Sequence, residues 1–159
     1  MLVRTAARGS NRRGAAMVEF AVILPLLLMF LMGIVEFGRL MMTLQIATTG
    51  SREGARYAAQ ADRSANDVRA YTRQYLAAAS IPAEAITTLA VEHQLLPEDP
   101  YYTAATGGWV DAASLATVPQ GRPVRVRLDL NFDRLTWIPS GLALAQGTIL
   151  NGTTVMRKE

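Results

Sequence analysis

One acidic side chain, Glu19, stands near the start of a stretch that is otherwise apolar. Residues 20–35 read FAVILPLLLMFLMGIV and carry no charge, and extending the stretch back to Ala15 adds only Glu19. An ionised carboxylate inside a membrane costs on the order of 3 kcal/mol on insertion scales. Glu19 therefore either reaches the membrane interface or pairs with a positive group, and the second interpretation makes it a candidate functional residue.

The other titratable side chains do not form a recognisable catalytic set. The chain has no Cys and a single His, His93, which excludes thiolate chemistry, cysteine-ligated metals and sites that need two imidazoles. It holds no nucleophile elbow, phosphate-binding glycine loop or zinc-peptidase motif. Asp129 and Asp133 are about 13 Å apart along a predicted strand, too far for a carboxylate pair, and Glu98-Asp99 is a weak calcium motif. We expect no enzyme activity, cofactor or metal.

Positive charge is concentrated ahead of the apolar stretch. Lys and Arg together number 16 against 13 Asp and Glu, a net charge of +3. Four Arg lie in the first 13 residues, where there is no acid, and without residues 1–14 the counts are 12 basic against 13 acidic residues. A short basic leader accounts for the charge better than a basic binding face does, so we expect no nucleic-acid partner.

The apolar stretch has the length of a membrane-spanning helix. At about 1.5 Å per residue, residues 15–35 span roughly 31 Å, close to the ~30 Å hydrocarbon core of a bilayer. No secretory-type cleavage site closely follows it. The Arg excess on its N-terminal side predicts residues 1–14 in the cytoplasm and the remainder across the membrane. Pro25 removes a helical hydrogen-bond donor, so we expect a kink or local loosening near residues 21–25.

The residues that lead into the apolar stretch follow a specific order. Residues 12–20 read RRGAAMVEF, so a basic leader ends in Gly14, four residues follow, and Glu19-Phe20 precede the apolar stretch. This order resembles a type IV prepilin signal. Together with three further runs, it makes the N-terminal third resemble the TadE-like family of tight-adherence (Tad, or Flp-type) pilus systems. The runs are ILPLL at 23–27, EFGR at 36–39 and GARYAA at 54–59.

The resemblance implies a minor pilin or pseudopilin that a prepilin peptidase cuts between Gly14 and Ala15. Gly14 has no side chain, which suits close approach of a protease. In pilins the acid that matches Glu19 is thought to pair with the N-terminal amine of a neighbouring subunit, and such a pair neutralises both charges among apolar helices. Phe20 and Pro25 belong to the same implied assembly region.

The implied partners are the prepilin peptidase, the major Flp-type pilin and other minor pilins, the inner-membrane assembly platform and the lipid bilayer. The resemblance places the chain in the inner membrane as a single-pass protein, with its C-terminal domain in the periplasm or in the pilus. A membrane-anchored accessory of pilus assembly or adhesion that never enters the filament is the alternative.

Beyond the apolar stretch, small and apolar residues keep a helical spacing. They recur at three- and four-residue steps from Arg39 to about Ala79, so residues 37–80 are expected to continue the long helix outside the membrane. Gly50 and Gly54 fall within this helix and indicate either a weak point or a close crossing with another helix.

Residues 81–159 are expected to form a small β-rich domain that includes a loop at 95–121. Residues 86–92 and 123–133 are predicted strands, the second with strict alternation of apolar and polar side chains. Residues 148–157 form either a last strand or a hairpin that turns at an Asn-Gly pair, Asn151-Gly152.

The predicted fold is therefore α+β and pilin-like. It combines a long N-terminal helix, whose first half (residues 15–36) spans the membrane, with a small antiparallel sheet packed on its C-terminal half.

Overall fold

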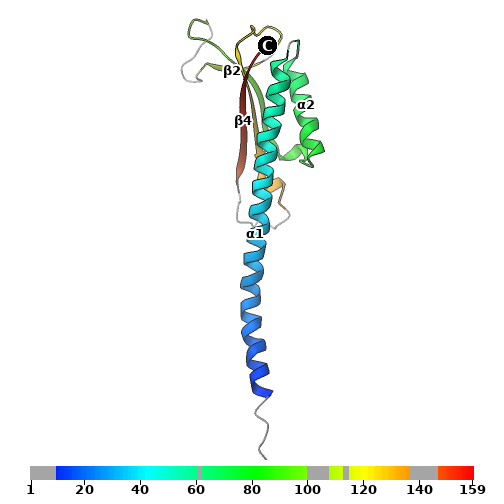
Figure 1. Ribbon diagram of the computed structural model, residues 1–159, viewed down its shortest axis with the longest axis vertical. Coiled ribbons are helices and arrows are strands. Elements are labelled where there is room, and N and C mark those ends of the chain that lie inside the picture. The colour runs from blue at the N-terminus through cyan, green and yellow to red at the C-terminus, as the bar shows by residue number, and fades with distance from the viewer. Residues whose placement is uncertain (1–9, 61, 100–107, 113–114, 137–146) are drawn as a thin grey trace, which may run out of the picture. The chain divides into compact units, whose positions relative to one another are not determined.

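The computed structural model describes residues 10–60, 62–99, 108–112, 115–136 and 147–159, with side chains from residue 14 onward. The chain divides into two units, Met1–Gly38 and Arg39–Glu159. Helix α1 (Ser10–Ala59) begins in the first unit and ends in the second. Figure 1 shows both units, and each is described by itself below.

The described part of the first unit is the N-terminal part of α1. Its side chains from Gly14 to Met32 are all exposed. Among the described residues, α1 is the one helix that is long and apolar enough to cross a membrane by its length and composition. It stays helical through Pro25, so the loosening expected near residues 21–25 does not break the helix.

The helical part of the second unit consists of two helices, which corrects the prediction of one helix up to residue 80. α1 ends at Ala59 and α2 (Ala65–Ala78) follows after a turn. Ser64 caps α2, because its hydroxyl accepts from the Asp67 N–H at 3.1 Å while the Asp67 carboxylate accepts from the Ser64 N–H at 3.2 Å. Such a reciprocal cap satisfies two helix donors that otherwise lack partners, and it fixes the start of α2.

The two glycines of the helical stretch lie where α1 and α2 cross closely. A Cβ built on Gly54 would lie 2.6 Å from Thr72 Oγ1, and one on Gly50 would lie 3.2 Å from Leu76 Cδ2. Near the same crossing, the rings of Tyr57 on α1 and Tyr71 on α2 stack with centroids 4.5 Å apart. The interpretation of Gly50 and Gly54 as a close helix crossing is therefore correct.

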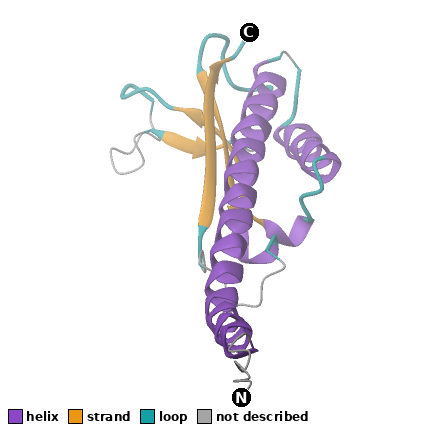
Figure 2. Cartoon of the chain, turned by 60° about the horizontal axis from the view of Figure 1, so that its bottom comes forward, coloured by secondary structure: helices purple, strands orange, loops and turns teal. Residues whose placement is uncertain are grey.

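Four antiparallel strands form one sheet in the order β2-β1-β3-β4. Figure 2 shows this sheet beside the two helices. The strands are β1 (Ile86–Gln94), β2 (Trp109–Asp111), β3 (Pro123–Asn131) and β4 (Ile149–Arg157), with the short 3-10 helices η1 (Ala83–Ala85) and η3 (Phe132–Arg134) before β1 and after β3. The expected strands at 86–92 and 123–133 are present with slightly different ends. β2 lies inside the expected loop 95–121, of which residues 100–107 and 113–114 are outside the described part.

The core lies on one face of this sheet. The alternate β3 residues Val124, Val126, Leu128 and Leu130 are fully buried, as their spacing predicts, and Arg125 and its polar neighbours lie on the other face. Contact with α1 requires a glycine on β4: a Cβ on Gly152 would lie 2.3 Å from the Ala47 carbonyl oxygen.

Strand β4 runs straight through Asn151-Gly152, so the hairpin alternative is wrong. Gly152 serves the approach of α1 to the sheet instead of a turn. Altogether the fold is α+β, with a four-stranded antiparallel sheet packed against the long N-terminal helix, and the predicted pilin-like arrangement is confirmed.

Candidate assembly site

The residues that the resemblance singles out all lie on the first unit of α1. Gly14 and Ala15 are part of the helix and exposed, and no atom outside the local helix lies within 4 Å of a Cβ built on Gly14. Arg4 and Arg8 lie outside the described residues, and the side chains of Arg12 and Arg13 are not described. The Gly14–Ala15 bond is thus open to approach, but a protease that binds extended substrate must first unwind this turn.

Glu19 and Phe20 follow one turn later. Ala15 and Glu19 are four residues apart, so they lie on the same side of the helix, about 6 Å apart along its axis. Both Glu19 and Phe20 are exposed, and no hydrogen bond or ion pair joins Glu19 to another described residue. Glu19 therefore has a free carboxylate that can meet a cation from outside its own chain.

An unbroken apolar surface continues from this point along the helix. Its large apolar side chains are between 36% and 75% exposed over residues 17–37. Exposing apolar surface to water costs roughly 25 cal/mol per Å². These side chains are Met17, Val18, Phe20, Val22, Ile23, Leu24, Leu26, Leu27, Leu28, Met29, Phe30, Leu31, Met32, Ile34, Val35 and Phe37. Such a surface requires either lipid or other apolar helices around it.

Three of the carboxylates weighed for catalysis or calcium, Asp99, Asp129 and Asp133, have structural partners. Asp129 accepts from Arg127 Nε at 3.2 Å and from the Asn151 amide, whereas the Asp133 carboxylate accepts from the Gly147 N–H at 3.0 Å. They serve two different places in the fold. Among the described residues there is no group of three or more His, Asp or Glu side chains that could hold a metal ion.

Asp99 belongs to an ion pair with Arg122. Arg122 Nη1 lies 2.8 Å from Asp99 Oδ2, and the Leu96 N–H also donates to this carboxylate at 2.6 Å. The Leu96 hydrogen bond first and Arg122 second hold the pKa of Asp99 below its usual range. The ion pair ties the segment that follows β1 to the residue that precedes β3.

His93 lies beside this pair on the core side of β1, opposite Val124. Its Nδ1 is buried and has no hydrogen-bond partner among the described residues. Burial lowers the pKa of His93 most, the Arg122 charge lowers it further, and the Asp99 charge opposes both. His93 is therefore a partly buried structural residue that favours the neutral form.

A buried cation near the end of the chain is the feature that sequence reasoning missed. Lys158 is only 6% exposed, and its ammonium donates to the carbonyl of Val118 at 2.9 Å and to the carbonyl of Leu115. Its N–H also donates to the Arg122 carbonyl at 3.0 Å. A lone Lys beside an apolar strand carries no sequence signal for such a role.

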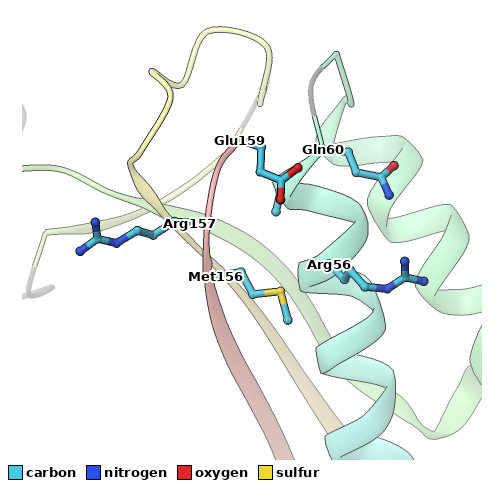
Figure 3. A pocket seen from close by; sticks show the side chains of 6 residues that line it. Arg56, Gln60, Met156, Arg157 and Glu159 are labelled. Carbon is cyan, nitrogen blue, oxygen red and sulfur yellow. The ribbon is translucent and has the colours of Figure 1, made fainter.

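An open cavity of about 520 Å³ lies between the end of α1 and the end of β4. Figure 3 shows Met156 pointing toward α1 while the guanidinium of Arg157 points away from it. Arg56 already pairs with Glu53 at 2.8 Å, and Gln60 and Glu159 complete the labelled rim. Nothing in this lining forms a reactive set, so the exposed N-terminal helix remains the candidate site.

Comparison with known proteins identifies this same helix. A family model described as TadE-like protein matches residues 14–56, which include the Gly14–Glu19 spacing and most of the described part of α1. No curated protein and no solved structure matches the chain significantly. TadE-like proteins are associated with Tad pili and are not known as enzymes, and one N-terminal apolar helix is consistent with a single membrane anchor. Over residues 14–56, the chain is similar to the TadE-like family.

Proposed function

We propose that the protein is a minor pilin or pseudopilin that takes part in the biogenesis of a Tad (Flp-type) pilus. The observation that supports this most is the exposed, apolar first unit of α1 with one unpartnered acid, Glu19, one turn after Gly14–Ala15. A plain anchor needs the apolar surface, but it does not need an acid at this place.

In this proposal a prepilin peptidase removes residues 1–14, and Ala15 becomes the new N-terminus. Residues 15–36 then span the inner membrane, with the leader side in the cytoplasm. Residues 37–80 and the β-rich residues 81–159 lie in the periplasm and enter the pilus with the subunit. The basic leader favours the cytoplasmic side, because positive side chains near a membrane helix are retained there.

Assembly follows from the chemistry of the new terminus. The apolar helix moves from lipid into a bundle of similar helices, a transfer that changes apolar burial little. Glu19 and the α-amine of a neighbouring subunit are then both desolvated, and each neutralises the other. Because Glu19 lies four residues after Ala15, this ion pair selects neighbours displaced by about one helical turn, roughly 6 Å. Phe20 and Pro25 shape the surface next to this pair.

The proposed partners follow from the same steps. They are the peptidase that cuts the leader, the major Flp-type pilin and other minor pilins that form the helix bundle, and the assembly platform that extracts the subunit from the bilayer.

The mature N-terminus tests the processing step. The full chain is expressed in membranes with and without the matching prepilin peptidase, and its N-terminal residue is determined by mass spectrometry. We expect Ala15 when the peptidase is present and the intact leader when it is absent. Substituting Gly14→Val should block the cut, whereas Gly38→Ala is a matched control that leaves it unchanged. An intact leader in both strains would refute the prepilin assignment.

Recovery with filaments tests the role of Glu19. We expect Glu19→Ala to insert into the membrane normally and to disappear from purified pili, because a buried amine then lacks its counter-ion. Glu19→Asp serves as the conservative control and should retain part of the recovery. Normal recovery of Glu19→Ala would reject the ion pair. Absence of the wild-type chain from pili would favour the accessory role instead.

A further inference from the structure

Strand β4 forms one edge of the sheet, and no described segment pairs with its outer side. β4 is the last strand in the order β2-β1-β3-β4. At the two ends of the β3–β4 ladder, the Phe132 N–H donates to Thr148 O and the Lys158 N–H donates to Arg122 O, each at 3.0 Å. Both bonds involve even-numbered residues of the β4 side, so the even-numbered residues of β4 are the ones that hydrogen-bond to β3. Antiparallel pairs alternate, so the odd-numbered residues turn their N–H and C=O groups away from β3.

These outward main-chain groups have no partner in the described part of the chain. No hydrogen bond of the described residues involves the main chain of the five odd-numbered residues, and all five side chains are exposed. The residues are Ile149, Asn151, Thr153, Val155 and Arg157. Proteins usually protect such an edge with a proline, a bulge, several charges or a short length. β4 has nine residues, no proline and only Arg157 as a charge.

The opposite edge of the sheet is β2. Its outward main-chain groups also have no partner among the described residues, and they match those of β4. The Leu95 N–H donates to Gly108 O and the Ala112 N–H donates to Val91 O. By the same alternation, Trp109 and Asp111 turn their main-chain groups away from β1.

The strand directions make these two edges complementary. Each strand is antiparallel to its neighbour, so β2 and β4, three steps apart, run in opposite directions. A second copy placed beside the first in the same orientation therefore brings its β2 against β4 as an antiparallel pair.

The register of this pairing can be read from the sheet itself. Asp111 pairs with Glu92, Glu92 with Arg125, and Arg125 with Val155, so Asp111 and Val155 lie at the two ends of one row. Without any shift along the strands, Asp111 of a second copy therefore meets Val155. Trp109 of that copy then meets Arg157, two rows further.

The side chains support this register. In a sheet, Arg157 would face the Trp109 ring directly and the Asp111 carboxylate diagonally, within reach of a long side chain. The chain already contains a contact of the same type, since the Arg125 guanidinium lies 4.3 Å from the centroid of the Trp109 ring. The Arg157 side chain points away from α1 (Figure 3). The Asp111 carboxylate accepts from Arg69 Nη2 on α2 at 2.7 Å, and its side chain is still 70% exposed.

We propose that the free edge of β4 binds the free edge of β2 of a second copy of this chain, with Val155 opposite Asp111 and Arg157 opposite Trp109. The choice of a second copy rests on the proposed function in one respect. A head-to-tail contact between two different edges can repeat without limit, as a filament subunit needs, whereas pairing of two β4 edges closes after two copies.

Cross-linking of the full chain in membranes tests this contact, because the sequence has no Cys of its own. Two copies with different tags are co-expressed, one with Val155→Cys and the other with Asp111→Cys, and oxidised with copper phenanthroline. Opposed residues have Cα atoms about 5.5 Å apart, which suits a disulfide. The matched control replaces Asp111→Cys with Ala90→Cys, which lies on the outer face of the inner strand β1.

We expect at least ten times more mixed dimer from the Val155→Cys and Asp111→Cys copies than from the control. A yield no higher than the control would overturn the proposal. A disulfide dimer of the single variant Thr153→Cys at the yield expected for the mixed dimer would also overturn it, because it would show that two β4 edges pair with each other.

The role of Arg157 is tested in the same assay. Adding Arg157→Glu to the Val155→Cys copy should lower the mixed dimer at least tenfold, since it removes the cation from the Trp109 ring of the Asp111→Cys copy. Arg73→Glu on α2 makes the same charge change at an exposed residue that belongs to neither β2 nor β4, and it should have no effect. Equal yields for the two variants would refute the proposed register. Leader cleavage is measured separately, so failure here is distinct from failure of the pilin assignment.

Discussion

The Ser51 hydroxyl on α1 lies 2.9 Å from the Thr154 hydroxyl on β4, at a point where Ser51 is fully buried. Because Ser51 Oγ donates to the Thr48 carbonyl at 2.9 Å, Thr154 must be the donor in the contact between the two hydroxyls. This hydrogen bond joins the helix to the edge strand of the sheet in the middle of the second unit.

Replacing this hydroxyl should weaken the contact between helix and sheet. We expect Ser51→Ala to lower the free energy of unfolding by about 1 kcal/mol, a typical value for one hydrogen bond. Urea unfolding of the full chain in detergent, followed by tryptophan fluorescence, measures the change. A double-mutant cycle with Thr154→Val should show that the two effects are not additive. Strict additivity would show that the two hydroxyls do not interact.

Gly152 should not tolerate a side chain. A methyl group at this position would lie 2.3 Å from the Ala47 carbonyl oxygen, and this atom belongs to the helix backbone, which cannot rotate away. We expect Gly152→Ala to destabilise the second unit by roughly 1–3 kcal/mol, as other overpacking changes do. Gly38→Ala is the control, because its Cβ would meet nothing within 4 Å. Equal unfolding curves for Gly152→Ala and wild type would contradict the close approach of α1 and β4.

Lys158 should contribute to stability through its ammonium group. Lys158→Met keeps an apolar stem of similar length but leaves the carbonyls of Leu115 and Val118 without their donor. A buried acceptor without a partner costs about 1–3 kcal/mol, so the urea midpoint should fall accordingly. The neighbouring change Arg157→Met removes an exposed charge and should stay within about 0.5 kcal/mol of wild type. If both variants unfold alike, the buried hydrogen bonds of Lys158 do not stabilise the fold.

His93 should make the stability depend on pH. Its pKa in the folded chain lies below the ordinary value of 6.5, mainly because burial penalises the charged form. Above pH 6.5 His93 is neutral in both states, whereas just below this value the unfolded chain binds a proton that the folded chain does not. The free energy of unfolding should therefore fall as the pH decreases from 6.5 through the folded pKa.

The His93→Gln variant is the comparison for this effect. It should show a smaller fall in stability between pH 7 and pH 5 than wild type, in urea titrations at each pH. Identical pH profiles would mean that His93 titrates at the same pH in both states.

Periodicity predicted the elements whose burial is one-sided. β3 has apolar side chains at every second residue from Val124 to Leu130, and the structure buries this set on the core side. The apolar stretch after Glu19 likewise predicted a membrane-spanning helix without a polar face, and the structure has an apolar helix there whose side chains from Gly14 to Met32 are exposed. In both cases the surroundings of each face determine whether its side chains are apolar or polar, so the pattern of residue types predicts the element and its orientation.

The break between the two helices escaped this reasoning for a physical reason. Alanine and other small residues suit a helix on either side of the turn, so the spacing alone does not show where α1 ends. The signal lies in Ser64 and Asp67, which form the reciprocal cap of α2. An acid three residues after a serine indicates a helix start, and here Asp67 takes the place that Glu or Gln more often occupies.

Two glycine interpretations depended on contacts that a sequence does not contain. An Asn-Gly pair such as Asn151-Gly152 is typical of a hairpin turn, but the approach of Ala47 from a distant helix decides the role of Gly152. The partners of Gly54 and Lys158 are also remote in sequence. Local patterns therefore predicted the elements, while the close contacts between them required the structure.

The burial of Lys158 has a consequence for covalent labelling. It is the chain's one lysine, and its amine is held inside the fold. Reagents that acylate amines under native conditions are thus directed to the α-amine alone, at whichever residue the polypeptide starts. A single tag on the intact molecule would report the state of its terminus and whether another subunit covers it.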